Sequence, residues 1–264
     1  MKSVLITGAY GGMGRATAER LAHEGYRVYA LDRCVLPSKN ENIVPLEADV
    51  TSAVSIEAAL SKIGDDELSA IVHFAGVYML DSLVEMSEED FRRIFDINLN
   101  GVFRVNRAAI PKLSHGAKII ITTSELAPLD PLPFTGIYAI SKAALDKYAY
   151  SLRMELSLLD ISVSVLRAGA VDTGMIGASQ TALEAFCEKT KLYSVSAENF
   201  KRVVDSVEAR RIPPEKIAAR VEKILTKRSP RFAYSINRTP LLLLLGALPK
   251  GVQLWVIGKI LNRK

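Results

Sequence analysis

Short apolar runs alternate along the chain with longer segments of helical periodicity, and this alternation is typical of a parallel β-sheet covered by helices on both faces. Each run is apolar at most positions, as expected of a strand buried on both faces. The runs expected to form strands are Ser3–Thr7, Arg27–Leu31, Ile43–Glu47, Ala70–Phe74, Lys118–Thr122 and Ser162–Leu166. Helices are expected from the first glycine cluster to about Glu24 and over about Ala53–Ile63, Glu88–Ala109 and Tyr138–Leu158. The pattern predicts an α/β fold with a doubly wound parallel sheet.

The length of 264 residues is enough for one large α/β domain and too small for two. With 49% hydrophobic and 24% charged residues, the composition is that of a packed globular protein rather than a disordered one. We expect residues 1–239 to form a single main domain. Residues 240–264 are expected to form an apolar and basic C-terminal extension with helical structure.

The extension begins with five consecutive leucines, Leu241–Leu245, and continues after Pro249 with a second apolar segment. A membrane-spanning helix needs about 20 apolar residues with few charges, and Pro249 and Lys259 interrupt this run. Two short helices at a membrane surface, with Trp255 at the level of the headgroups, fit residues 240–261. Packing on the core, on a second subunit or over a hydrophobic substrate entrance fits the same pattern equally well.

The net charge is +5, but residues 227–264 hold eight basic residues and no acidic one, so the remainder carries −3. The main domain is therefore not expected to bind nucleic acid. The two cysteines, Cys34 and Cys187, and the three scattered histidines have no metal-ligand spacing, so we expect reduced thiols and no metal. The first strand begins too early to leave room for a signal peptide, and we expect a cytoplasmic protein that contacts a membrane at most at its surface.

A glycine-rich turn with the sequence TGAYGGMG, residues 7–14, joins the first strand to the first helix. The N-terminus of a helix presents unpaired N–H groups with positive dipole character, and glycines let a pyrophosphate approach the backbone. Glycine spacing alone is weak evidence, because ordinary strand–helix turns are also rich in glycine. The position at the first strand–helix junction favours a bound dinucleotide.

Acidic residues follow the second and third expected strands. Asp32 closes the second strand, where a carboxylate accepts hydrogen bonds from the ribose hydroxyls of NAD and repels the extra phosphate of NADP. Arg33 would offset part of that repulsion, so NAD is expected and NADP is the less favoured alternative. Asp49 is placed either to bind the adenine amino group or to cap the helix that follows.

A tyrosine and a lysine, Tyr138 and Lys142, are four residues apart in an expected helix and so share one face. A tyrosine with its ordinary pKa of about 10 is a poor base at neutral pH. A neighbouring cation favours the phenolate, so Lys142 is expected to lower the pKa of Tyr138. The tyrosine then exchanges a proton with an alcohol or ketone oxygen. Such pairs also occur on ordinary helix surfaces, so the pair alone decides nothing.

Two further polar residues fall where a substrate is expected. Ser124 follows the fifth strand, and ligands of parallel sheets bind beyond the carboxyl ends of the strands. Asn98 lies inside a helical pattern although asparagine is a mediocre helix former, which suggests a buried polar role. The alternatives are a turn-capping serine and a solvent-facing asparagine.

Taken together, these residues resemble the short-chain dehydrogenase/reductase family in its compact single-domain branch, over about residues 1–230. The glycine turn matches the family's TGxxxGxG pattern. The resemblance implies a Rossmann-type dinucleotide-binding catalytic domain. It implies that Tyr138 is the acid/base, that Ser124 orients the substrate oxygen, that Lys142 binds the nicotinamide ribose and that Asn98 holds a water in a proton relay.

The sequence departs from the family pattern at two places. The family usually has Asn-Asn-Ala-Gly after the fourth strand, where this chain has HFAG at residues 73–76. It usually has Pro-Gly after the sixth strand, where this chain has Ala168-Gly169. Neither change touches the catalytic tetrad. The residues expected to contact the cofactor are Gly8, Tyr10, Gly11, Gly12, Met13, Gly14, Asp32, Arg33, Asp49, Val50, Ala75, Gly76, Tyr138, Lys142, Gly169, Val171 and Thr173.

The expected function is an NAD(P)-dependent oxidoreductase acting on a secondary alcohol/ketone pair. In the family, the region after Thr173 forms a mobile lid, and here Gly174–Val195 carries Met175, Ile176, Phe186, Leu192 and Tyr193. These side chains suggest a hydrophobic, steroid- or lipid-like substrate, although they would serve equally to pack on the core.

Alternatives remain open within and outside this reaction class: a 3-oxoacyl thioester reductase, a sugar-nucleotide epimerase, and an NAD(H)-binding redox sensor without turnover. The intact tetrad argues against the sensor, and the absence of a large C-terminal substrate domain argues against the epimerase. The family usually forms oligomers through helices equivalent to Glu88–Ala109 and Tyr138–Leu158, so we expect a homodimer or homotetramer.

Overall fold

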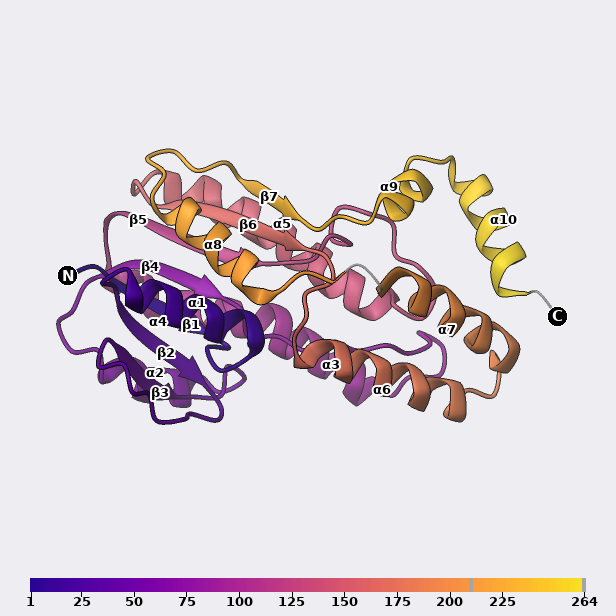
Figure 1. Cartoon of the computed structure of the whole chain (residues 1–264), viewed down its shortest axis with the longest axis horizontal. Helices are drawn as coiled ribbons and strands as arrows, with labels where there is room; N and C mark the ends of the chain where they lie inside the picture. Colours follow the sequence, from indigo (N-terminus) through magenta and orange to yellow (C-terminus); the bar gives the residue numbers. More distant parts are fainter. Residues whose placement is uncertain (209–210, 263–264) are drawn as a thin grey trace.

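The computed structural model describes residues 1–208 and 211–262. Its centre is a parallel sheet with the strand order β3-β2-β1-β4-β5-β6-β7 (Figure 1). The strands are β1 (Ser3–Thr7), β2 (Arg27–Asp32), β3 (Ile43–Glu47), β4 (Leu68–His73), β5 (Leu113–Thr122), β6 (Ser162–Ala168) and β7 (Ala233–Ile236). The strand order reverses between β1 and β4, which is where doubly wound sheets open a crevice at their carboxyl edge.

Helices cover both faces of the sheet. The helices are α1 (Gly12–His23), α2 (Ala53–Ser61), α3 (Glu88–Phe95), α4 (Gly101–Ala109), α5 (Gly136–Ser157), α6 (Gly174–Lys189), α7 (Ser194–Glu208), α8 (Pro214–Leu225), α9 (Pro240–Gly246) and α10 (Lys250–Leu261). On one face α1 packs against α8 over the apolar side chains of β1, β2 and β6. On the other face α2, α4 and α5 cover a second apolar layer. The expected α/β fold with helices on both faces is confirmed.

All six expected strands form, with ends that shift by a few residues, and the sheet gains a seventh strand that the apolar pattern did not predict. Of the four residues of β7 only Tyr234 is buried, so the segment lacks the continuous apolar run of a central strand. Helix α8 was not predicted either, although Pro213 and Pro214 in front of an apolar periodicity are typical of a helix start.

The single helix expected over Glu88–Ala109 is interrupted. α3 ends at Phe95, a π-helical turn spans Asp96–Asn100, and α4 begins at Gly101. A π turn widens the helix by one residue and is common at functional sites. Asn98 lies in this turn and is fully buried.

The C-terminal extension forms two short helices that meet at Pro249 and lie beyond β7, at the end of the molecule opposite the N-terminus (Figure 1). Gln253 fixes the bend by donating hydrogen bonds to the Leu248 carbonyl and to Asp130, which also pairs with Lys250. Leu261 packs in an apolar cluster with side chains of α6 and α7. Arg263 and Lys264 lie outside the described residues.

His73 occupies the first position of the family's Asn-Asn-Ala-Gly and bonds to the neighbouring strand and to a helix. Its imidazole is buried at the end of β4, with Nε2 2.9 Å from Asn106 Oδ1 and Nδ1 3.4 Å from Thr7 Oγ1. Thr7 Oγ1 also accepts a hydrogen bond from the Ala75 N–H. The histidine therefore links β1, β4 and α4. Burial lowers its pKa from 6.5 to about 4.

This burial predicts a pH-dependent stability. Between pH 6.5 and about pH 4 the unfolded chain binds a proton at His73 that the folded chain does not, so the free energy of unfolding falls as the pH falls. The loss from this residue is roughly 3 kcal/mol by the low end of that window. Denaturant titrations across the window measure it.

His73→Asn should flatten this part of the pH profile, whereas His23→Asn, which changes an exposed histidine, should leave it unchanged. A His73→Asn protein with the wild-type pH profile would show that this imidazole does not carry the effect.

Candidate active site

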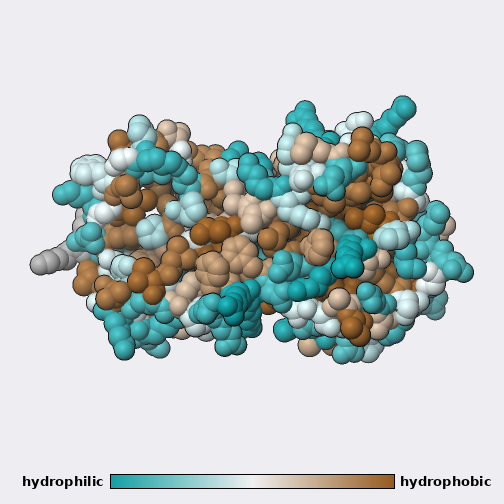
Figure 2. Space-filling view, turned by 180° about the vertical axis from the view of Figure 1, so that it is seen from behind, coloured by the Kyte–Doolittle hydropathy of each residue, from teal (hydrophilic) through white to brown (hydrophobic). Residues whose placement is uncertain are grey.

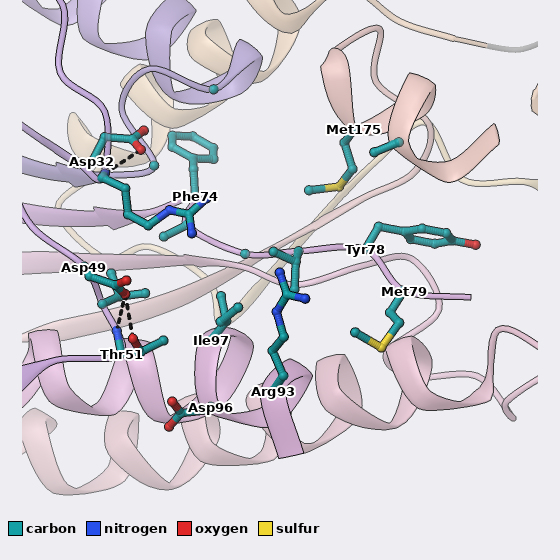
Figure 3. A pocket seen from close by; sticks show the side chains of 18 of the residues that line it. Asp32, Asp49, Thr51, Phe74, Tyr78, Met79, Arg93, Asp96, Ile97 and Met175 are labelled. Carbon is teal, nitrogen blue, oxygen red and sulfur yellow. Dashed lines mark hydrogen bonds between the residues drawn. The ribbon is translucent and has the colours of Figure 1, made fainter. Parts of the chain in front are cut away.

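A cleft of about 1600 Å³ opens at the carboxyl edge of the sheet, where the strand order reverses between β1 and β4. Figure 3 shows side chains reaching into it from the ends of β2, β3 and β4 and from α3 and α6. The expected cofactor residues that line it are Gly8, Tyr10, Gly11, Gly12, Met13, Gly14, Asp32, Arg33, Asp49, Val50, Ala75, Gly76 and Thr173. The tertiary structure thus brings together residues from five separate segments.

The glycine turn forms a cradle at the N-terminus of α1. Gly8 has φ = +65°, a conformation that favours glycine. A Cβ at Gly14 would lie 2.0 Å from the Gly8 carbonyl oxygen, so no side chain fits there. The N-cap Gly11 offers no side-chain cap, and the first turn of α1 has no acidic residue. The N–H groups of this helix end therefore face the cleft without a carboxylate in front of them, which fits a pyrophosphate.

The two acidic residues at the strand ends have different surroundings. Asp32 accepts hydrogen bonds from the Tyr10 N–H at 2.9 Å and from the Arg33 N–H at 2.8 Å, which ties the glycine turn to the end of β2. Asp49 accepts from the Thr51 N–H at 2.8 Å and from its hydroxyl, and the backbone bond is the main cause of its lowered pKa. The alternative that Asp49 caps the following helix is wrong, because Ser52 is the N-cap of α2.

Asn98 is held rigidly at the inner side of the cleft by the π turn. Its Oδ1 accepts from the Val77 N–H at 2.8 Å, and its Nδ2 donates to the Val77 carbonyl at 3.0 Å and to Ser141 Oγ at 3.1 Å. The solvent-facing alternative is therefore wrong. The side chain joins the loop after β4 to α5, which carries the tyrosine and the lysine.

Tyr138, Lys142 and Ser124 are buried together beside Asn98. A Cβ added at Gly76, on the wall of the cleft, would lie 3.4 Å from Lys142 Nζ and 3.1 Å from Asn98 Oδ1. Lys142 Nζ donates to the Thr122 carbonyl at 3.3 Å and lies 5.8 Å from the centroid of the Tyr138 ring. Asn98 of the π turn and Lys142 of α5 thus converge behind one glycine of the cleft, with Tyr138 beside Lys142.

The pKa of Tyr138 is higher than expected from the sequence. Burial raises it to about 12, while a hydrogen bond with Ser124 acts in the opposite direction. Burial lowers the pKa of Lys142 to about 8. Desolvation therefore outweighs the expected effect of the neighbouring cation, because both groups are withdrawn from water. At neutral pH Tyr138 is therefore protonated and neutral, and Lys142 is still mostly the ammonium form.

Two of the expected nicotinamide-loop residues do not line the cleft. Val171 is buried and forms an isolated bridge with Ile212, and Gly169 packs against the backbone of Asn237. Only Thr173 of this group reaches the cleft. Their positions depend on the segments after α7 and β7, which the sequence motif does not include.

The structure also adds cleft residues that no motif indicated, among them Tyr78, Met79 and Arg93, and it places Met175 of the expected lid there as well. In Figure 3, Arg93 from α3 and Met175 from α6 reach toward the middle of the cleft from opposite sides. The Tyr78 ring lies 4.9 Å from the Tyr138 ring, centroid to centroid. These residues lie in the loop after β4 or on helices without a recognisable motif. Only their bulky or charged side chains could have marked them in the sequence as candidates for the site.

Most of the expected lid is packed on the molecule. Leu183 and Phe186 are buried with Phe134 and Phe200, and Tyr193 joins this cluster at its edge. The segment between α6 and α7 is tied to the loop after β4, because Glu85 accepts hydrogen bonds from the Thr190 hydroxyl and from two backbone N–H groups. Core packing thus accounts for Phe186 and Tyr193, whereas Leu192 is exposed and Met175 lines the cleft. The side chain of Ile176 lies outside those that the structure describes.

Comparisons with known proteins agree with this geometry. Residues 2–184 match the family described as short chain dehydrogenase. The chain is 27% identical over 238 residues to the 3-ketodihydrosphingosine reductase of Bacteroides thetaiotaomicron, covering 89% of this chain and 87% of that protein. It is 32% identical over 179 residues to the NADPH-dependent 1-acyldihydroxyacetone phosphate reductase of Schizosaccharomyces pombe, covering 65% and 60%.

Solved structures share the fold. A short chain dehydrogenase from Burkholderia cenocepacia in complex with NADP superposes with a TM-score of 0.74 at 22% identity, covering 100% of both chains. A 3-ketoacyl-(acyl-carrier-protein) reductase from Brucella melitensis complexed with NADH does so with a TM-score of 0.72 at 22% identity, covering 89% of this chain and 96% of that one. With the family match over residues 2–184, the chain belongs to the short-chain dehydrogenase/reductase family and is an NAD(P)-dependent oxidoreductase.

Proposed function

We propose that the protein interconverts a secondary alcohol and a ketone on a hydrophobic, lipid-like scaffold, with Tyr138 as the acid/base. The observation that carries this proposal is the surrounding of Tyr138. Ser124 opposes the rise in the pKa of the Tyr138 hydroxyl, and the ring lies in an apolar cluster. The partly buried members of that cluster are Val77, Tyr78, Met79, Met86, Phe95 and Leu126. A carbonyl embedded in an apolar molecule fits such a site better than a sugar does.

The nicotinamide group supplies or accepts the hydride. In the reducing direction Tyr138 gives its proton to the carbonyl oxygen that Ser124 holds by a hydrogen bond. The ammonium group of Lys142 stabilises the phenolate that remains. The Asn98 side chain bonds to the N–H and to the carbonyl of Val77 and so holds the loop after β4 in place. In this proposal Asn98 also orients a water of the proton relay.

The named activities of the two relatives support a lipid-like substrate, since both names describe ketones on long-chain lipids. A 3-oxoacyl thioester remains the alternative, supported by the fold shared with a 3-ketoacyl reductase. A panel of long-chain ketones, steroids and 3-oxoacyl thioesters, followed by the absorbance of the reduced nicotinamide with both cofactors, distinguishes them. No turnover of any member would favour the redox-sensor alternative.

Tyr138→Phe should lower kcat by about 10²–10⁴-fold because only the titrating hydroxyl is lost. Cofactor affinity should stay close to that of the wild type, since the ring still packs. Lys142→Met should damage both turnover and cofactor affinity.

Tyr26→Phe, at a half-buried tyrosine before β2 that does not line the cleft, is the control and should behave as wild type. Steady-state kinetics and calorimetric cofactor titrations measure both effects. Near-normal turnover of Tyr138→Phe would refute the assigned mechanism.

We propose that NAD(H) is preferred over NADP(H), because the carboxylate of Asp32 stands at the end of β2 on the wall of the cleft. The 2′-phosphate of NADP would have to approach this charge, and the neighbouring Arg33 offsets the repulsion only in part. The relatives include an NADPH-dependent enzyme, so membership of the family does not determine the cofactor. We propose that Asp32 and Arg33 determine the choice between NAD(H) and NADP(H) in this chain.

Titration of both cofactors should show tighter binding of NAD(H). Asp32→Asn should lower the ratio of the NAD(H) affinity to the NADP(H) affinity about tenfold. Arg33→Ala should raise this ratio of affinities. Tighter binding of NADP(H) to the wild-type protein would overturn the assignment and give Arg33 the leading role.

We propose a homodimer or homotetramer, supported by large apolar side chains that lie exposed on α4 and α5. Phe103, Tyr150 and Met154 are each about half exposed. Apolar residues on neighbouring helix faces are typical of subunit interfaces.

We also propose that the C-terminal extension contacts a membrane at its surface. No helix of the described chain is both long and apolar enough to cross a bilayer. However, α10 is apolar on all sides, and only one side packs on the protein: Leu254 is 72% exposed and Trp255 64%. Figure 2 shows hydrophobic residues in a band toward the end of the molecule that carries the C-terminus. Because residues 227–264 include no acidic residue, an anionic lipid surface complements this extension.

Co-sedimentation with anionic vesicles at low salt tests this contact. The wild-type chain should pellet with anionic vesicles and less with neutral ones. Leu254→Ser combined with Trp255→Ser should weaken binding at least tenfold, by roughly the loss of two buried apolar side chains. Val54→Ser, which changes an exposed apolar residue on α2, should have no effect. A wild-type protein that stays in the supernatant as a detergent-independent oligomer would assign the extension to a subunit interface instead.

A further inference from the structure

The residue after the catalytic serine is a buried carboxylate that holds the beginning of the extension. Glu125 is 9% exposed. Its Oε2 accepts a hydrogen bond from the Thr239 N–H at 2.6 Å, and its Oε1 accepts from the Thr239 hydroxyl at 3.0 Å. Both carboxylate oxygens are thus bonded to one residue 114 positions later in the chain. Hydrogen bonds to a charged acceptor are stronger than neutral ones.

Glu125 is itself fixed to the site. The backbone N–H of Glu125 donates to the Ala168 carbonyl at 3.0 Å, at the end of β6. The Leu126 N–H donates to Ser124 Oγ at 3.2 Å, so the serine and the glutamate share one tight turn. A displacement of Glu125 therefore moves the hydroxyl that would hold the substrate oxygen.

Thr239 gives up its usual role to make this contact. It is the N-cap residue of α9, and a threonine at this position normally accepts a hydrogen bond from the first turn of its own helix. Here its side chain forms no capping bond, and its hydroxyl donates to Glu125 instead. The first helix of the extension is thereby attached to the turn that carries Ser124.

The same junction contains the loop after β6, which leads to Thr173 on the wall of the cleft. The Gly169 N–H donates to the Ile236 carbonyl at 3.0 Å, and Asn237 Nδ2 donates to the Ala170 carbonyl at 2.7 Å. A Cβ at Gly169 would lie 1.9 Å from the Asn237 carbonyl oxygen and 2.9 Å from Glu125 Oε1. The residues that lead into α9 thus lie in direct contact with the loop and with Glu125.

We infer that Glu125 is a positioning residue that couples the C-terminal extension to Ser124 and to the loop after β6. Occupation of the cleft by a dinucleotide, on which this inference rests as part of the proposed function, orders the loop and through it α9. By thermodynamic linkage, any contact that orders α9 strengthens cofactor binding by the same factor. The extension is accordingly a part of the active site and not an appendage to it.

Amide hydrogen exchange of the full chain tests the coupling without a known substrate. The nicotinamide dinucleotide that binds more tightly is added at saturation, and exchange is followed in the glycine turn (residues 8–14) and in α9. In the wild type, cofactor should slow exchange in both segments. In Thr239→Val the slowing in α9 should fall about tenfold, as expected for the loss of one hydrogen bond to a carboxylate. Protection of the glycine turn should remain.

Thr239→Ser restores the hydroxyl and should restore the protection of α9, and Glu125→Gln should lose it as Thr239→Val does. Thr226→Val, which removes a hydroxyl that bonds only within α8, is the matched control. With an active substrate, Thr239→Val and Glu125→Gln should lower kcat more than they change the KM for cofactor, and Thr239→Ser should not.

The inference is overturned if cofactor protects the glycine turn of the wild type and leaves α9 unchanged, or if Thr239→Val keeps the full protection of α9. Both results are independent of vesicle binding, since the experiment contains no lipid. A failure of the proposed membrane contact and a failure of this coupling are therefore read from separate measurements.

Discussion

The parallel pairing of β1 with β4 is the constraint on which the site depends. Both strands end at the same edge, and the chain leaves them toward opposite faces of the sheet, so a crevice opens between the two crossovers. The backbones come so close there that a Cβ at Gly8 would lie 2.6 Å from the Ala75 nitrogen. His73 and Thr7 hold this approach from within. The glycine turn and the loop that leads to Asn98 both start from this contact.

Burial of the polar groups determines how the chemistry is set up. Tyr138 and Lys142 are removed from water, so their pKa values move apart: that of Tyr138 rises to about 12 and that of Lys142 falls to about 8. A phenolate formed in such a place depends on the nearby ammonium group much more than it would in water. A π turn between α3 and α4 adds one residue to the helical turn that carries Asn98. This turn directs the Asn98 side chain toward Val77 and Ser141.

The C-terminal extension is only partly buried against the main domain. Leu261 and Gln253 are buried against the main domain, while Leu254 and Trp255 on the same helix are exposed. A helix that is apolar on all sides normally lies in an interior, so the uncovered side calls for a partner. Its attachment through Thr239 to Glu125 means that the partner would act next to Ser124, for which we propose a role in catalysis.

The sequence alone was sufficient for the parts of the protein that depend on local chemistry. Continuous apolar runs indicated the six longer strands, because strands buried on both faces exclude polar residues. The glycine turn and the tyrosine–lysine pair were recognisable since their function requires a fixed spacing within one element. The motif residues Ser124, Asn98, Tyr138 and Lys142 do converge, as the resemblance implied.

Only the tertiary structure decided the features that depend on contacts between distant segments. β7 is stabilised by pairing with β6 rather than by its own pattern, and the withdrawal of Gly169 and Val171 from the cleft results from packing against Asn237 and Ile212. The raised pKa of Tyr138 comes from desolvation by residues of several elements, which spacing in sequence does not reveal. The bond between Glu125 and Thr239 joins residues with no motif in common, and its two partners meet only because β5, β6 and β7 end side by side.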